Sequence, residues 1–108
     1  MSYARTVNFT TTEANQDILN IPAVRDSMKL VTKADNDMEF DMMRRNGIYM
    51  RADVFVSNTQ VSVNGQGYND LIENLYYTTE EMLKIYSLRI KDGGISGTLN
   101  FLIGMGEK

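Results

Sequence analysis

The chain lacks cysteine, histidine and tryptophan, and it has a single proline among its 108 residues. Without cysteine there is no disulfide framework, no thiolate chemistry and no cysteine-bearing metal site. Without histidine there is no imidazole base and no histidine-dependent nucleophile, and the usual zinc and copper ligands are missing. The sequence therefore predicts a protein that is not an enzyme and has no catalytic residue, metal site or cofactor.

Long hydrophobic runs are missing as well. No window of about 18 apolar residues is available to cross a membrane, and residues 1–9 lack the apolar core of an export signal. The formal net charge is −3 with both signs interspersed, which argues against a nucleic-acid partner. We therefore expect a soluble protein without a membrane partner, located in the cytoplasm of the producing cell or incorporated in a virion.

The sequence is instead rich in methionine, with 8 residues, and contains 6 tyrosines. Methionine side chains adapt to irregular surroundings, both in cores and at interfaces. A chain of 108 residues is long enough to bury a hydrophobic core without covalent staples. We therefore expect residues 1–108 to form one α+β domain.

The strongest secondary-structure signal lies in residues 38–64. Apolar side chains recur at every second position in three runs, 38–43, 48–56 and 61–63. This period is typical of strands with one buried face. The sequence therefore predicts an antiparallel β-meander of three consecutive strands.

Turn residues set the expected register of this meander. Asn46-Gly47 predicts a hairpin between the first two runs. A loop with Gly47 in a bulge pairs Met42 with Met50 on the apolar face, whereas a two-residue loop mixes the faces. A second loop around Asn58-Thr59 places the third run antiparallel to the second.

The sequence pattern of the N-terminal part of the chain predicts a strand followed by two helices. Residues 3–11 alternate as a strand does, and Thr10 with Glu13 fits a capping box for a helix that ends before Pro22. Pro22 then begins a second helix whose apolar residues recur at i, i+4 and i+7. We expect a kinked helical segment that covers one face of the sheet.

Toward the C-terminus, Asn69 and Thr78 are the expected N-caps of two short helices, although residues 74–79 would serve equally well as a strand. Residues 86–90 then pair with the following strand through the turn Asp92-Gly93. The expected fold is thus α+β: an antiparallel β-meander, a C-terminal β-hairpin, an N-terminal kinked helical segment and short helices packed on one face.

One face of the predicted meander is less polar than a solvated face usually is. It carries Met43, Tyr49 and Phe55 beside a cross-strand pair of Asp41 and Arg51. Such a pair contributes under about 1 kcal/mol when exposed. We therefore expect another element or molecule to cover this face.

The C-terminal strand is apolar on both faces near its end. A strand of this kind is either central in a sheet or paired with another molecule. The predicted partner-binding residues on these two surfaces are Met43, Tyr49, Arg51, Phe55, Leu99, Phe101, Leu102 and Ile103.

Three further patterns are better explained without a ligand. The acidic run from Asp35 to Asp41 lacks the glycine and the distal glutamate of a calcium loop, and charged edges are common on solvated strands. Gly65-Gln66-Gly67 is followed by Asp70 where a bound phosphate would have to sit. The aromatic residues of the meander face are suited to base stacking, but their acidic neighbours repel phosphates.

Two functions from different classes are consistent with these observations. The first is a non-catalytic structural or interaction protein that binds itself or another protein, forming a homo-oligomer or a larger assembly, such as a small virion or phage-type accessory component. The alternative is a small-ligand or nucleotide-binding module that sequesters a signal molecule or inhibits an enzyme. Substituting Tyr49, Arg51 and Phe55 distinguishes them: loss of assembly favours the first, and loss of a ligand at unchanged mass favours the second.

Overall fold

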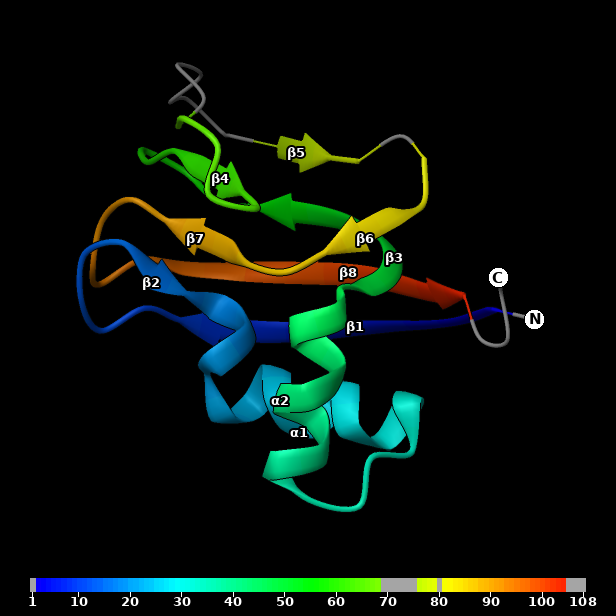
Figure 1. Cartoon of the computed structure of the whole chain (residues 1–108). Helices are drawn as coiled ribbons and strands as arrows, with labels where there is room; N and C mark the ends of the chain where they lie inside the picture. The colour runs from blue at the N-terminus through cyan, green and yellow to red at the C-terminus, as the bar shows by residue number, and fades with distance from the viewer. Residues whose placement is uncertain (1, 69–75, 80, 105–108) are drawn as a thin grey trace.

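The computed structural model describes residues 2–68, 76–79 and 81–104 (Figure 1). In chain order the elements are β1 (Ser2–Thr10), β2 (Gln16–Asp17), a 3₁₀ turn η1 (Ile18–Asn20), α1 (Pro22–Thr32), α2 (Asp37–Asn46), β3 (Ile48–Phe55), β4 (Val61–Val63), β5 (Tyr76–Thr78), β6 (Leu83–Ile85), β7 (Leu88–Ile90) and β8 (Ser96–Gly104). The predicted α+β class with antiparallel strands is confirmed.

The larger of the two sheets has the strand order β1-β8-β3-β5, and all its pairs are antiparallel. The strand β6 pairs with the first half of β3, while β5 pairs with its second half. Because β8 lies between β1 and β3, the two-faced apolar strand is central in the sheet, which was one of its two predicted positions.

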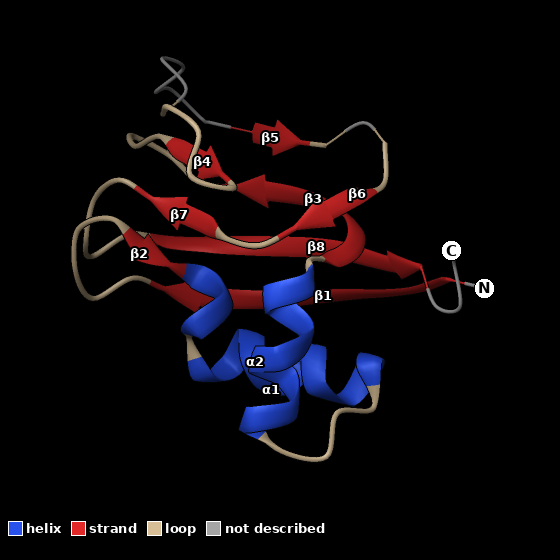
Figure 2. Cartoon of the chain, in the orientation of Figure 1, coloured by secondary structure: helices blue, strands red, loops and turns tan. Residues whose placement is uncertain are grey.

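The smaller sheet has the order β2-β7-β4. The chain bends between β6 and β7 and so passes from one sheet to the other (Figure 1). In Figure 2 the helix α2 and the smaller sheet lie in front of the larger sheet, and α1 lies beside β1. The helices and the smaller sheet thus share one side of the larger sheet.

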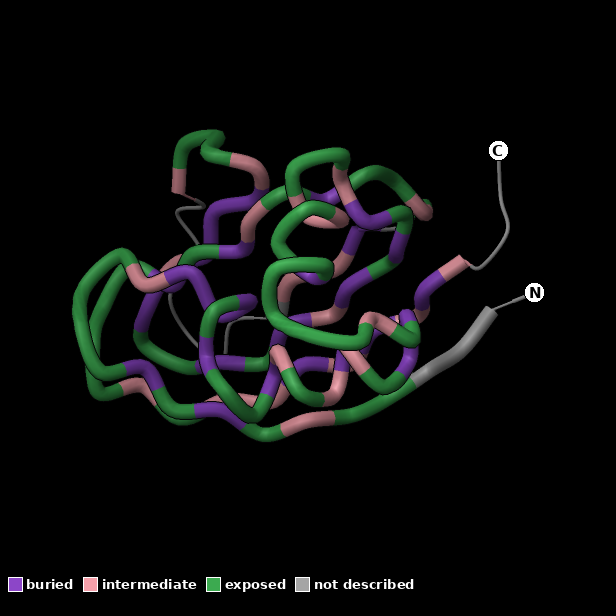
Figure 3. The backbone as a smooth tube through the Cα atoms, turned by 60° about the horizontal axis from the view of Figure 1, so that its bottom comes forward, coloured by how far each residue is buried: buried purple, intermediate pink, exposed green. Residues whose placement is uncertain are grey.

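The hydrophobic core fills the space between these layers. Along β3 buried and more exposed residues alternate strictly. Figure 3 shows where buried, intermediate and exposed residues lie along the whole backbone. Ile48, Met50, Ala52 and Val54 face the core, which confirms the face predicted for this run. They pack with side chains from the other elements, among them Phe9, Ile18, Leu19, Val24, Met28, Val31, Phe40, Val61, Ile85, Leu88, Ile90, Leu99, Phe101 and Ile103.

The prediction of a strand in residues 38–43 is wrong, because this segment is the helix α2. The Asn36 side chain accepts a hydrogen bond from the Glu39 N–H (2.8 Å), and the Glu39 side chain accepts one from the Asp35 N–H (2.6 Å). These contacts satisfy free N–H groups at the start of a helix. The local cap therefore prevails over the strand-like alternation of apolar residues, and in the helix Phe40 and Met43, three positions apart, pack against the core.

The hairpin turn predicted at Asn46-Gly47 is wrong as well, because the segment before it is a helix. Gly47 has a φ of +84° and donates its N–H to the Arg44 carbonyl, so it ends α2 instead of closing a hairpin. Only Phe40 of the predicted apolar face is buried, whereas Met38 and Met42 are exposed.

Two predicted strand pairings are also wrong. The strand β4 pairs with β7 and not with β3, and β7 pairs with β4 and β2 and not with β8. The loop 91–95 is held by Thr11: Gly94 donates its N–H to the Thr11 carbonyl, and Thr11 donates its own to the Ile95 carbonyl (both 2.8 Å). These contacts lead the chain from the smaller sheet to the larger one instead of folding it back in a hairpin.

The helical predictions were partly correct. The helix α1 begins at Pro22 as expected, and a break at Ile21 separates it from η1. The helix predicted from Thr10 is wrong, because residues 11–15 form a loop and β2 follows. The helix predicted from Thr78 is wrong too, since β5 ends there and Thr79 extends the pairing by exchanging hydrogen bonds with the Ala52 backbone. The helix predicted from Asn69 lies outside the described residues.

Candidate functional site: the open face of the larger sheet

One face of the larger sheet is covered by no described helix or strand. We call it the open face. Its members are the outward-facing residues, identified from the strand registers: Thr6, Asn8 and Thr10 of β1, Ser96, Thr98, Asn100 and Leu102 of β8, Tyr49, Arg51, Asp53 and Phe55 of β3, Thr78 of β5 and Lys84 of β6.

The half of the open face that lies on β1 and β8 is polar and internally bonded. Three side-chain contacts link the two strands: Thr6 Oγ1 donates to Asn100 Oδ1 (2.6 Å), Thr98 Oγ1 donates to Asn8 Oδ1 (2.9 Å), and the hydroxyls of Thr10 and Ser96 lie 3.1 Å apart. Because these groups satisfy one another, this half needs no partner to fix its side chains.

The half on β3 has a different character. Tyr49 and Phe55 are 36% and 37% exposed, large fractions for aromatic residues in a sheet. Between them lie Arg51 and Asp53, whose Nη2 and Oδ2 atoms are 3.4 Å apart. The second carboxylate oxygen of Asp53 is buried and receives no hydrogen bond from the described residues. A buried acceptor without a donor is costly, so Asp53 is the least satisfied group of this face.

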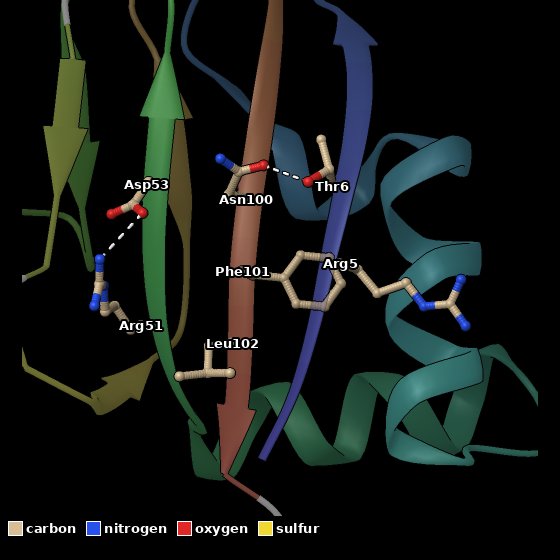
Figure 4. A pocket seen from close by; sticks show the side chains of 7 residues that line it. All are labelled: Arg5, Thr6, Arg51, Asp53, Asn100, Phe101 and Leu102. Atoms are coloured by element: carbon tan, nitrogen blue, oxygen red, sulfur yellow. Dashed lines mark hydrogen bonds and ion pairs between the residues drawn. The ribbon is translucent and has the colours of Figure 1, made fainter.

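A shallow hollow of about 410 Å³ lies where the two halves meet. Figure 4 shows Arg51 and Asp53 side by side on β3, with Asn100 and Leu102 on β8 and the Arg5 side chain directed away toward the helix. The hollow contains a single carboxylate, so it offers no pair of acids for general acid–base chemistry. Among the described residues no group of three or more Asp or Glu side chains is placed to hold a metal ion.

The structure brings some of the predicted contact residues together. Tyr49, Arg51 and Phe55 share the open face, and Leu102 lies beside Arg51 on the neighbouring strand. Asp41, the expected partner of Arg51, instead forms an ion pair with Arg25 of α1. That predicted cross-strand pair is wrong because its strand is a helix.

The other predicted contact residues lie elsewhere. Leu99, Phe101 and Ile103 are at most 2% exposed and form part of the core, so they are not accessible to a partner in this fold. Met43 lies on α2, where it packs partly against the core. The site that remains consists of the outward residues of β3 with Leu102.

Sequence reasoning missed the polar residues of the open face. Asn100 and Thr98 line β8 next to β3, but the predicted hairpin assigned that strand to another neighbour. The alternation of Thr6 and Asn8 with Val7 in β1 was the available signal, since it marks one polar face of a strand.

None of the described helices is long and apolar enough to span a bilayer. Comparisons with models of protein families, with curated proteins and with solved structures found no match for this chain.

Proposed function

We propose that this chain is a non-catalytic interaction protein that forms a homo-oligomer through the open face. The observation that carries the proposal is the exposure of Tyr49, Phe55 and Arg51 on a sheet face that no described element covers. Aromatic residues and arginine are the types enriched at protein interfaces. A small virion or phage-type accessory component is one setting in which such a protein would act.

The size of the open face supports this proposal. The larger sheet has five strands but is four strands wide, because β5 and β6 share one edge of β3, and neighbouring strands lie about 4.8 Å apart. The strand β8 has nine residues at about 3.3 Å each. The face therefore measures roughly 600 Å² in projection, close to the ~800 Å² that each partner contributes to a stable interface. The polar half on β1 and β8 would form the hydrated part of such an interface.

The test is the native mass, measured by light scattering after size exclusion at several protein concentrations. We expect a multimer that Phe55→Glu dissociates, because this change buries a charge at the contact. Leu30→Glu is the matched control, since Leu30 is an exposed apolar residue on α1, outside the open face. A monomer at every concentration, or equal effects of the two variants, would contradict the proposal.

The second candidate is a module that binds a small ligand in the hollow. Asp53, with its unpartnered oxygen, supports it because it supplies an acceptor that a ligand hydroxyl or amine would satisfy. Asp53→Asn would then abolish binding of a ligand without changing the native mass. In the proposed oligomer the same variant instead weakens association.

A further inference from the structure

We infer that two copies of this chain pack their open faces together about a two-fold axis that crosses β3 at Ala52. The inference rests on the proposed function and specifies its geometry. The outward residues of β3 are, in order, Tyr49, Arg51, Asp53 and Phe55, so an aromatic residue, a cation, an anion and a second aromatic residue follow one another. Ala52 is the midpoint of this series. When a reversed copy of the series is laid against it, each aromatic residue meets an aromatic residue and each charge meets the opposite charge.

The direction of the axis follows from the charges. If the axis lies between the sheets and perpendicular to β3, Arg51 faces the partner's Asp53 and Tyr49 faces the partner's Phe55. If the axis runs along β3, Arg51 faces the partner's Arg51 and Asp53 faces the partner's Asp53. Like charges in direct opposition destabilise an interface, so the pattern selects the perpendicular axis. An interface of this kind is isologous and closes at two copies.

Both charged groups have unused hydrogen-bonding capacity. Within the described residues the Arg51 side chain makes a single polar contact, at 3.4 Å to Asp53, although its guanidinium has five N–H donors. The terminal torsion of an aspartate is soft, so its orphaned oxygen can turn toward the rim of the hollow. The guanidinium of a second copy would bind the carboxylate in a bidentate pair, with two parallel N–H···O hydrogen bonds.

The neighbouring strand is compatible with the same axis. On β8 the axis crosses at the level of Phe101, which pairs with Ala52. Thr98 then faces the partner's Gly104, and Leu102 faces the partner's Asn100, so no like charges meet. Sheets packed face to face lie about 10 Å apart with strands rotated by about 30°. Residues near the axis, including the charged pair, are displaced least by this rotation.

The experiment uses cross-linking, because the chain has no cysteine that would react in the background. Tyr49→Cys and Phe55→Cys are prepared separately and treated with a bis-maleimide that spans about 10 Å, the spacing of packed sheets. The two positions are six residues apart, or about 20 Å along a strand. We expect cross-linked dimers in the mixture of the two variants and almost none in either variant alone.

A charge exchange tests the pairing independently. Arg51→Asp and Asp53→Arg should each raise the dimer dissociation constant by at least about 100-fold. The double variant R51D/D53R should restore self-association and should not pair with the wild type. Circular dichroism of each variant confirms that the monomer fold is intact.

The outcomes separate the two proposals. A native protein that is monomeric at all concentrations overturns the proposed function together with this inference. A dimer in which Tyr49→Cys cross-links to itself leaves the proposed function standing and overturns the position of the axis. A dimer that is indifferent to the single charge reversals overturns the exchange of Arg51 and Asp53 between copies.

Discussion

Replacing Arg44 with methionine is expected to lower the free energy of unfolding by about 3 kcal/mol, the lower end of the range for a broken buried ion pair. Arg44 reaches from α2 to form an ion pair with Asp17, at the junction of β2 and η1. The two side chains are only 15% and 4% exposed. The guanidinium also donates to Asn20 Oδ1 (2.5 Å) and to the Tyr86 carbonyl (3.2 Å). One side chain thus joins three separate segments.

The magnitude follows from what the substitution leaves behind. Removing one partner of a buried pair costs about 3–5 kcal/mol, because the other charge remains desolvated. Asp17 Oδ1 keeps its hydrogen bonds from the backbone N–H groups of Leu19 (3.1 Å) and Leu88 (3.2 Å), which moderates the loss. Methionine preserves the helix propensity and much of the apolar stem of arginine. The loss in unfolding free energy therefore measures the effect of removing the charged group.

The assay is urea unfolding followed by circular dichroism at one protein concentration, since oligomerisation would otherwise contribute. Arg45→Met is the matched control, because Arg45 is the exposed neighbour on the same helix and its loss should change stability by less than about 0.5 kcal/mol. The double variant D17N/R44M should be more stable than the sum of its single changes predicts. A loss for Arg44→Met within about 1 kcal/mol of the control would refute the reasoning, because surface pairs contribute no more than that.

Two further substitutions test the packing and the electrostatics. A Cβ atom at Gly97 would lie 2.6 Å from Val56 Cγ1, so Gly97→Ala should lower the unfolding free energy by about 1–3 kcal/mol. The control is Gly67→Ala, where the added Cβ would meet no atom of the described residues beyond its chain neighbours within 4 Å, so the thermal midpoint should stay nearly unchanged. A hydrogen bond from Lys29 lowers the pKa of Asp37 below its usual 3.8, so this carboxylate stabilises the fold above that pH and loses its contribution as the pH falls through the lowered value. Asp37→Asn should therefore reduce the drop in urea midpoint between about pH 5 and pH 2.5, and an equal drop in both proteins would contradict this assignment.

The parts of the fold that the sequence predicted correctly are those set by local periodicity. The alternation in β3 runs over eight residues, long enough to fix which face is buried. The helix α1 combines Pro22 at its first position with an apolar stripe, two signals that agree. By contrast, the spacing of Met38, Phe40 and Met42 is that of a strand, and the cap at Asn36 was the signal for the helix that forms instead.

Strand pairing was less predictable because distant contacts determine it. The Thr59 side chain accepts a hydrogen bond from the Asp92 N–H (3.2 Å), and Lys91 donates its N–H to the Gln60 carbonyl (3.0 Å). These contacts align β4 with β7 across a separation of some thirty residues. The turn signal Asp92-Gly93 was compatible with a hairpin locally, but the contacts around it place the next strand in the other sheet.

The same distinction explains which parts of the candidate site were found. Tyr49, Arg51 and Phe55 belong to one strand, so their common face follows from its period of two. Asn100 and Thr98 join them only because β8 pairs with β3, and that pairing has no local signal. Asp53 lies on the same face of the same strand, but its unpartnered oxygen depends on the arrangement of neighbouring strands.

The residues that hold the fold and those proposed to make contact lie on opposite sides of the larger sheet. Arg44 and Asp17 act between the helices and the smaller sheet, whereas Arg51 and Asp53 lie on the open face. Since sites without shared partners contribute additively, Arg44→Met should lower the unfolding free energy of the isolated subunit and leave the contact surface unchanged. The charge reversals on the open face should weaken association and leave the unfolding free energy of the isolated subunit nearly unchanged. A loss of assembly that follows only from the second set would therefore be an effect on the interface and not a by-product of unfolding.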